Sequence, residues 1–248
     1  MRAAVMVGVG EPLQVVDDVD LEPPRGGEVR VRVEACGVCH SDQALVEGDF
    51  PLLGPTVPGH EAAGVVVETG PGVATLAVGD HVVLSPNPAC GHCEYCTRGL
   101  PSVCTGSMSI ATAMLPDGTT RLSRHGQVVF RGLGLGAWAE EVVVAESGAI
   151  RVDPDVPLDV ACVVGCAVQT GVGAAVNTAG VRPGDAVLVM GAGGVGISIV
   201  QGARIAGASR IVVSDPSASR REQAMRFGAT DVVDPTADDP VEAVLAMT

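Results

Sequence analysis

Four cysteines in the first half of the chain have a regular spacing. Cys90, Cys93, Cys96 and Cys104 form Cys-x2-Cys-x2-Cys-x7-Cys within fifteen residues. One loop with this spacing can arrange four sulfurs tetrahedrally around Zn²⁺. In an iron–sulfur cluster the usual fourth cysteine follows at a shorter interval and precedes a proline. We therefore predict a structural zinc site, without an open position for substrate, in a lobe of about residues 88–106.

Four further cysteines and a histidine lie outside this lobe: Cys36, Cys39, Cys162, Cys166, and the His60 of Gly59-His60-Glu61. A catalytic zinc needs three protein ligands and one open position. By residue type alone, each of these cysteines is more readily explained as a small buried apolar side chain. A second zinc site is compatible with these residues, but their types do not assign its ligands.

A glycine-rich segment follows the apolar stretch Ala186–Met190 and precedes a predicted helix. This strand–turn–helix context is the one that a dinucleotide-binding glycine pattern requires. Gly191 permits a tight turn, Gly193 lets a pyrophosphate approach the backbone, and Gly196 allows close packing of the helix on the strand. The residues predicted to bind cofactor here are Gly191, Gly193, Gly194, Val195 and Gly196.

Asp215 ends the next predicted strand. A carboxylate at this position accepts hydrogen bonds from the adenosine ribose and repels a 2′-phosphate, which favours NAD over NADP. The alternative role is a helix N-cap, because Asp215-Pro216 precedes a predicted helix.

The elements that must position these residues differ between the two halves of the chain. Residues 1–152 contain short strands with alternating side chains, separated by Gly and Pro: Arg2–Val7, Val29–Val33, Gly64–Glu68 and His81–Leu84. A period of two indicates half-buried antiparallel strands, so we predict a small barrel or sandwich.

Residues 153–248 have a longer rhythm of strand, helix, strand, helix and strand. The expected elements are Ala186–Met190, Gly194 to about Ala206, Ile211–Ser214, about Ser217 to Phe227, and Asp231–Val233. This order predicts a parallel α/β unit.

Composition excludes several classes of function. The 29 acidic and 15 basic residues give a charge of −14, which argues against nucleic acid as a partner. The uncharged stretch Val160–Val181 has the length of a bilayer span, but its polar residues and glycines favour the interior of a soluble protein, so we expect no membrane partner. Eight cysteines without a signal peptide favour metal binding over disulfides and predict a cytoplasmic protein.

The motifs occur in a fixed order: Gly37–Asp42, Gly59–Glu61, the cysteine lobe, Gly165-Cys166 and Gly191–Gly196. This series resembles the zinc-dependent alcohol dehydrogenases of the medium-chain dehydrogenase/reductase family along all 248 residues. The segment from Met114 to Trp138 looks like the class I and class III branch. The resemblance implies a GroES-like, partly open all-β barrel with a zinc lobe, followed by an incomplete α/β Rossmann domain containing the first three parallel strands.

The resemblance also implies ligands for a catalytic zinc. Cys39, His60 and Cys166 match the family's ligand positions, with water or an alcohol oxygen in the fourth place. Cys36 and Cys162 fall outside the motifs, and we interpret them as buried thiols. Each chain is thus expected to bind two Zn²⁺ ions, one catalytic and one structural.

Neighbouring polar residues are assigned in the same way. Glu61 matches a carboxylate close to the metal that assists ligand exchange, and Asp42 should accept a hydrogen bond from the His60 ring. Ser41 occupies the position of the hydroxyl that passes the alcohol proton outward. The family's next relay residue, a histidine, is Ala44 here, so we expect proton release through water or ribose.

Three further cofactor contacts follow from the resemblance. His40 stands where a basic residue contacts the pyrophosphate, and Thr170 matches a position on the nicotinamide side. Arg220 matches a basic residue that reaches the adenosine ribose, although a solvated helix charge explains it nearly as well.

The expected function is an oxidoreductase that interconverts an alcohol with its aldehyde or ketone by transferring hydride to NAD. The alternatives are thiol-dependent oxidation of formaldehyde as a hydroxymethyl-thiol adduct, and a truncated zinc-binding module without catalysis. A full dinucleotide fold has six parallel strands, and three are predicted here. We therefore expect a longer protein that forms homo-oligomers, and a 248-residue chain that alone binds NAD weakly and turns over poorly.

Overall fold

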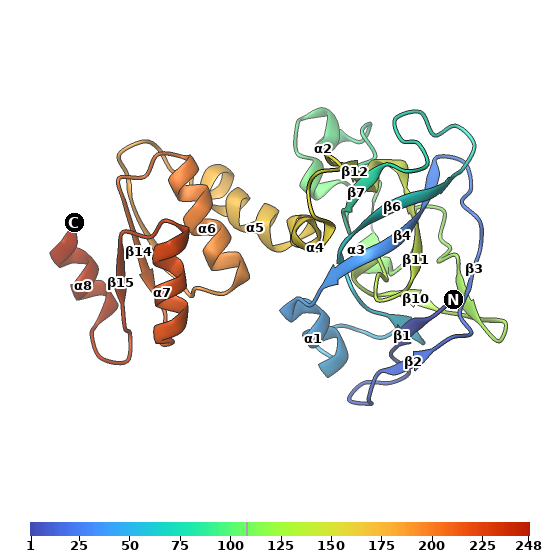
Figure 1. Cartoon of the computed structure of the whole chain (residues 1–248), viewed down its shortest axis with the longest axis horizontal. Helices are drawn as coiled ribbons and strands as arrows, with labels where there is room; N and C mark the ends of the chain where they lie inside the picture. Colours follow the sequence, from blue (N-terminus) through green and yellow to red (C-terminus); the bar gives the residue numbers. More distant parts are fainter. Residues whose placement is uncertain (108) are drawn as a thin grey trace. The chain divides into compact units, whose positions relative to one another are not determined.

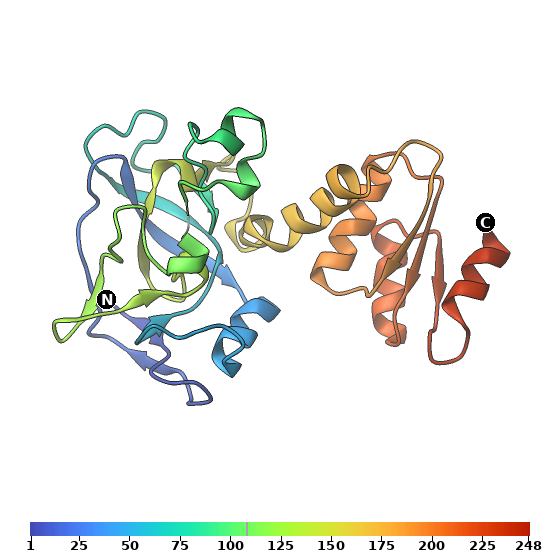
Figure 2. The same ribbon diagram turned by 180° about the vertical axis from the view of Figure 1, so that it is seen from behind.

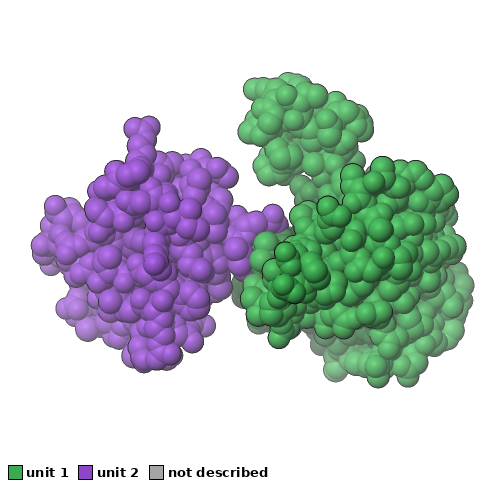
Figure 3. All heavy atoms as spheres, turned by 45° about the horizontal axis from the view of Figure 1, so that its top comes forward, with its two compact units in different colours: residues 1–166 green, residues 167–248 purple. Residues whose placement is uncertain are grey.

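The computed structural model describes residues 1–107 and 109–248. The chain divides into two compact units, Met1–Cys166 and Ala167–Thr248 (Figure 3). Each unit has its own hydrophobic core.

The division lies later in the chain than the expected boundary between residues 152 and 153. After β12 (Ala149–Arg151), the short helices α4 (Leu158–Ala161) and η4 (Cys162–Gly165) continue the first unit. Ala161 and Cys162 pack there with Ala63 and Val83 of the barrel strands. Because these side chains complete a core of the first unit, the chain leaves that unit only at Cys166.

The first unit is built around a five-stranded antiparallel sheet with the order β11-β4-β6-β7-β12 (Figure 1). Val29 and Val31 of β4 are fully buried, whereas Arg32, the next residue of the same strand, is exposed. This alternation confirms the period of two. The other strands of this sheet are β6 (Glu61–Thr69), β7 (His81–Leu84) and β11 (Glu141–Ala145), and β4 spans Glu28–Gly37.

Smaller sheets complete the barrel: β1 pairs with β2, β5 with β10, and β8 with both β3 and β9. Their bounds are Ala3–Val5 (β1), Gln14–Val16 (β2), Asp20–Leu21 (β3), Thr56–Val57 (β5), Leu122–Arg124 (β8), Gln127–Val128 (β9) and Phe130–Arg131 (β10). The helices of this unit before α4 are α1 (His40–Glu47), α2 (Glu94–Thr97), η1 (Pro101–Val103), α3 (Ser109–Thr112), η2 (Gly132–Gly134) and η3 (Glu146–Gly148).

The second unit contains the parallel sheet β13-β14-β15. Its core joins Val189 of β13, Val200 of α6, Ile211 of β14 and Ala224 of α7. The elements are α5 (Ala167–Gly173), η5 (Ala174–Thr178), β13 (Ala186–Met190), α6 (Gly194–Ile205), β14 (Arg210–Ser214), α7 (Ala218–Phe227), β15 (Asp231–Val233) and α8 (Pro240–Met247). Figure 2 shows α6, in orange, and α7, in a darker orange, packed beside the sheet. The predicted alternation of strand and helix is confirmed. The first and last residues of these five elements lie within one residue of the predicted bounds.

The uncharged stretch that begins at Val160 is less buried than expected. Val160 is 63% exposed and Val176 is 40% exposed, because these short helices pack only one side on their neighbours. Among the described residues no single helix is long and apolar enough to cross a membrane, and Leu158–Gly165 and Ala167–Thr178 reach that length and hydropathy only when counted together.

Candidate metal centres and cofactor site

The three residues proposed as catalytic zinc ligands come together in the first unit. Cys39 Sγ, a ring nitrogen of His60, a carboxylate oxygen of Glu61 and Cys166 Sγ lie within 4.8 Å of one another. His60 Nε2 is 3.3 Å from Cys166 Sγ. A tetrahedral zinc with normal bond lengths holds a sulfur and a nitrogen about 3.5 Å apart. The two sulfurs and the imidazole therefore fit Zn²⁺.

Two neighbouring strands bring most of this centre together. Gly37, the last residue of β4, pairs with Glu61, the first residue of β6. Because antiparallel strands place the end of one beside the start of the next, Cys39 and His60 emerge at the same edge of the sheet. Glu61 is 4% exposed, so its carboxylate belongs to a largely buried site.

Cys166 reaches the centre from a distant part of the chain. It follows η4, and the preceding Gly165 lies against the end of β7, where an added Cβ would be 2.4 Å from the Leu84 carbonyl oxygen. Only a residue without a side chain permits this approach. The sequence pattern Gly-Cys thus reflects packing as well as ligation.

Asp42 links the two ligand-bearing segments. Its carboxylate is fully buried, and Oδ1 accepts hydrogen bonds from His60 Nδ1 at 3.0 Å and from the Gly59 backbone N–H at 2.9 Å. Oδ2 accepts from the Cys39 backbone N–H at 3.1 Å. The bond to His60 was expected from the resemblance. The two backbone bonds were not, since they depend on how α1 begins beside β6.

The protonation of His60 depends on the same neighbours. Burial opposes the charged ring, but hydrogen bonds with Asp42 and Cys166 raise the pKa of the imidazole to about 10 in the metal-free chain. A zinc ligand must be the neutral imidazole, so metal binding at this centre releases a proton.

The cysteine lobe forms a second metal-ligating group, consisting of Cys90, Cys93, Cys96 and Cys104. The sulfurs of Cys93 and Cys104 are 3.8 Å apart, and sulfurs in a tetrahedral zinc site are separated by about 3.8 Å. The Cys90 and Cys93 backbone N–H groups donate to Cys104 Sγ and Cys90 Sγ, each at 3.3 Å. Four sulfur ligands fill the coordination sphere, so this site suits a structural ion.

Backbone donors in the lobe also favour thiolates. An N–H bond from Cys96 lowers the pKa of the Cys93 thiol to about 5, and one from Cys90 lowers the pKa of Cys104. Burial raises the pKa of the Cys96 thiol to about 12, so this cysteine must lose its proton when the metal binds. The backbone donors therefore favour the metal-binding thiolate at Cys93 and Cys104.

Cys36 and Cys162 belong to neither metal-ligating group among the described residues. Burial raises the pKa of the Cys36 thiol to about 12, and burial likewise raises that of Cys162. Cys162 donates instead to the Asp159 carbonyl oxygen at 3.3 Å. Both therefore remain protonated thiols at neutral pH.

Ser41, proposed for proton transfer, and His40, proposed to contact the pyrophosphate, lie on the first turn of α1. Cys39 is the N-cap of this helix, His40 is exposed and Ser41 is half-buried. Ala44 lies one turn after Ser41 and carries no ionisable group. The roles of His40 and Ser41 remain predictions.

The glycine segment of the second unit forms a turn between β13 and α6. Gly191 has φ +91°, and a Cβ on Gly196 would lie 1.9 Å from the Gly191 carbonyl oxygen, so a side chain there would displace the turn. Gly193 is the N-cap of α6, with no heavy atom within 4 Å of a Cβ placed on it. Gly194 and Val195 begin the helix and are exposed. The open backbone at a helix N-terminus suits a phosphate.

Asp215 follows β14 and bridges this turn to the start of α7. Its Oδ2 accepts from the Ala192 backbone N–H and its Oδ1 from the Ser217 backbone N–H, each at 2.8 Å. Ser217 is the N-cap of α7, so Asp215 is not that cap. Burial opposes its ionisation, but the two N–H bonds lower the pKa of Asp215. Arg220 is exposed, with a guanidinium nitrogen 4.0 Å from Oδ2.

Thr170 is exposed on α5. The next residue, Gly171, contacts α6 closely, because a Cβ on it would lie 2.4 Å from Ser198 Cβ. Thr170 is thus held near the helix that follows the glycine turn, and its contact with nicotinamide remains a prediction.

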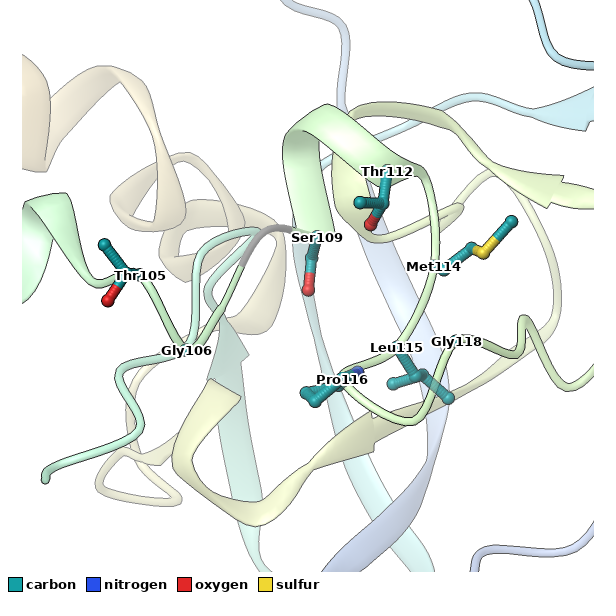
Figure 4. Close-up of a pocket in the computed structure, with 8 residues that line it drawn as sticks. All are labelled: Thr105, Gly106, Ser109, Thr112, Met114, Leu115, Pro116 and Gly118. Carbon is teal, nitrogen blue, oxygen red and sulfur yellow. The ribbon is translucent and has the colours of Figure 1, made fainter. Parts of the chain in front are cut away.

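A separate cavity of about 230 Å³ lies between the end of the cysteine lobe, α3 and the following loop (Figure 4). Its lining residues are Thr105, Gly106, Ser109, Thr112, Met114, Leu115, Pro116 and Gly118. Since none of these lining residues is titratable, the cavity supplies hydroxyl groups and apolar surface without acid–base chemistry.

The chain is similar to known dehydrogenases. Residues 25–154 match the alcohol dehydrogenase GroES-like domain family, and residues 194–248 match the zinc-binding dehydrogenase family. The chain is 43% identical over 247 residues to an S-(hydroxymethyl)glutathione dehydrogenase of Escherichia coli, covering 98% of this chain and 67% of that protein.

Solved structures agree with this similarity. One is an alcohol dehydrogenase zinc-binding domain protein from Burkholderia ambifaria, with a TM-score of 0.93 and 39% identity. Another is the benzyl alcohol dehydrogenase from Acinetobacter calcoaceticus, with a TM-score of 0.91 and 34% identity. Each match covers all of this chain and 67% of the other. The chain belongs to the zinc-dependent alcohol dehydrogenases of the medium-chain dehydrogenase/reductase family, and it comprises a GroES-like domain and part of a Rossmann domain.

Proposed function

We propose that Cys39, His60 and Cys166 hold the catalytic zinc of an enzyme that transfers hydride between an alcohol and NAD. The observation that carries the proposal is the convergence of these three ligand atoms with a Glu61 oxygen within 4.8 Å. Three protein ligands leave one position open, unlike the four-cysteine lobe. Zn²⁺ bound there supplies Lewis acidity toward a hydroxyl or carbonyl oxygen.

The chain's own residues orient this centre and move the proton. Asp42 accepts a hydrogen bond from the Nδ1–H of His60, which leaves Nε2 free to act as a ligand. We assign the first proton-accepting step to the Ser41 hydroxyl. Because Ala44 cannot accept a proton, the proton leaves Ser41 to water or to the coenzyme ribose.

The cofactor proposal rests on the turn after β13 and on Asp215. The α6 N-terminus offers backbone N–H groups to a pyrophosphate. Asp215 is anchored by two backbone N–H bonds beside this turn, so a fixed negative charge lies where a 2′-phosphate would have to bind. This charge favours NAD over NADP.

Two substrate classes are compatible with the family. Simple primary or aromatic alcohols are our first choice. The hydroxymethyl adduct of a small anionic thiol is the second, and the 43% identity to an S-(hydroxymethyl)glutathione dehydrogenase is compatible with it. The ratio of kcat/KM for benzyl alcohol and for S-hydroxymethylglutathione separates them.

The test of the proposed centre uses one ligand variant and a matched control. Cys39→Ser should lower zinc content from two ions to one and abolish alcohol-dependent NADH formation. Cys162→Ser removes a buried thiol of the same unit outside both metal groups, so it should retain both ions and the activity. Equal zinc content in the two variants would contradict the proposal. An unsubstituted chain that holds zinc in the lobe but none at Cys39, His60 and Cys166 would support the non-catalytic module.

Assembly and location remain predictions. Size-exclusion chromatography of the protein purified from its source cells would test homo-oligomer formation. Fractionation of the source cells would test the cytoplasmic location.

A further inference from the structure

Trp138, the only tryptophan in the sequence, contacts both segments that lead into the proposed zinc ligands. Its indole Nε1–H donates to the Gly37 carbonyl oxygen at 3.4 Å. Gly37 ends β4 two residues before Cys39. One contact of the indole is therefore made with the segment that carries the first ligand.

The second contact is made with Gly59, the residue before His60. Gly59 has φ +94°, and a Cβ added to it would lie 2.4 Å from Trp138 Cδ1 and 2.8 Å from Cγ. The indole ring thus packs directly against the Gly59 backbone. A larger residue at position 59 would collide with the ring and would also be strained at this φ.

Backbone hydrogen bonds hold the same segments in register. The Trp138 N–H donates to the Pro58 carbonyl oxygen and the Ala137 N–H to that of Gly59, both at 2.9 Å. The Trp138 carbonyl oxygen accepts from the Ala4 N–H at 2.8 Å. Trp138 is therefore anchored to β1 while its side chain contacts the two ligand segments.

The remaining face of Trp138 is supported by the barrel. The side chain packs against the core that includes Val5, Val57 and Val129, all fully buried. Core side chains at native packing density move little, so the indole cannot shift without disturbing this core.

We propose that Trp138 is a positioning residue for the catalytic zinc, which fixes the spacing of Cys39 and His60 through Gly37 and Gly59. Asp42 provides one link between the two segments, and the indole provides a second. Phenylalanine at position 138 would keep the ring against Gly59 but lose the donor to Gly37. The effect should therefore appear in metal retention more than in folding.

The experiment compares Trp138→Phe with Phe130→Leu. Phe130 is a matched control because its ring packs on Gly54, where a Cβ would lie 2.9 Å from Cε2, and Gly54 adjoins no proposed ligand. Zinc release from the intact chain is followed with a chromophoric chelator. We expect release of the catalytic ion to accelerate about 10-fold in Trp138→Phe. Lobe zinc should leave at the unsubstituted rate, and Phe130→Leu should retain both ions.

Equal release of the catalytic ion from Trp138→Phe and Phe130→Leu would overturn the inference. If Trp138→Phe does not fold, the unsubstituted chain provides the test. Co²⁺ placed at the catalytic position should quench most of the Trp138 fluorescence, since the indole adjoins both ligand segments. Unchanged emission would refute the proximity on which the inference rests.

The inference rests on the proposed function, and the failures of the two are distinguishable. An unsubstituted chain with two zinc ions and equal release rates refutes the role of Trp138 alone. An unsubstituted chain that holds zinc only in the lobe refutes the catalytic centre, and the role of Trp138 with it.

Discussion

Replacing Asp42 with asparagine tests how the zinc ligands are held. The carboxylate is fully buried and accepts three hydrogen bonds, from His60 Nδ1 and from the backbone N–H groups of Gly59 and Cys39. An asparagine has the same shape but only one acceptor oxygen. If that oxygen faces His60 and Gly59, the amide NH₂ faces the Cys39 N–H, and two donors oppose each other.

The size of the effect follows from these bonds. A hydrogen bond to a charged group contributes about 1.5–3 kcal/mol, and a buried donor left without an acceptor costs about 1–3 kcal/mol. Asp42→Asn should therefore lower the free energy of unfolding by about 2–4 kcal/mol. Loss of the carboxylate behind a ligand histidine should weaken catalytic zinc binding about 10–100-fold.

The assay measures both quantities on the same samples. Urea unfolding with both zinc ions bound gives the free energy, and competition with a chelator gives the affinity of the catalytic ion. Asp80→Asn is the control, because Asp80 also accepts a backbone N–H, from Ala77 at 2.9 Å, but on the exposed surface. The free energy of unfolding of the Asp80→Asn variant should differ from that of the unsubstituted chain by about 0.5 kcal/mol or less.

One outcome would refute the reasoning. If Asp42→Asn and Asp80→Asn release the catalytic zinc equally and differ little in free energy of unfolding, Asp42 does not hold the ligand segments. Lower stability with unchanged zinc affinity would mean that Asp42 supports the fold without orienting His60.

Three further predictions concern other parts of the chain. Cys93→Ser should reduce zinc content from two ions to one and destabilise the chain by about 4 kcal/mol or more, because a lobe ligand is lost, as zinc analysis and urea unfolding would measure. Burial opposes ionisation of Asp117, but hydrogen bonds from Arg121 and Thr119 lower its pKa from 3.8 to about 2. Its stabilising effect should thus be complete above about pH 4 and vanish as the pH falls toward 2, so acid unfolding of Asp117→Asn and the parent should converge there. Ala44→His should add an ionisation near pH 6.5 to the kcat profile, since it restores an imidazole beside the proposed relay.

Local patterns predicted the fold well. Alternation along residues 29–33 and the apolar run Ala186–Met190 each determine their own element, and both strands are found as expected. The cysteine lobe could also be predicted from the sequence, because its four ligands lie close together along the chain and one loop supplies them all. In the two strands and in the lobe, the interactions that determine the structure involve residues close together in the sequence.

The spacing of residues along the chain did not predict which side chains form the other metal centre. Cys39, His60 and Cys166 become neighbours only through strand pairing and the approach of η4 to β7, so a resemblance was needed to select them over Cys36 and Cys162. The later end of the first unit has a similar cause. The sequence pattern assigned its last turns to the second unit, but they bury Cys162 against the barrel strands.

The two metal centres therefore relate differently to folding. In the lobe, the four ligands close a short loop, and zinc binding itself supplies the free energy that orders it. The proposed catalytic ligands lie far apart in the sequence, between residues 39 and 166, so the barrel must already hold them together before a metal arrives. Asp42 and Trp138 act at that stage, since each links the Cys39 segment to Gly59. Removal of the lobe zinc should thus unfold the lobe, whereas removal of the catalytic zinc should leave an ordered, empty set of ligands.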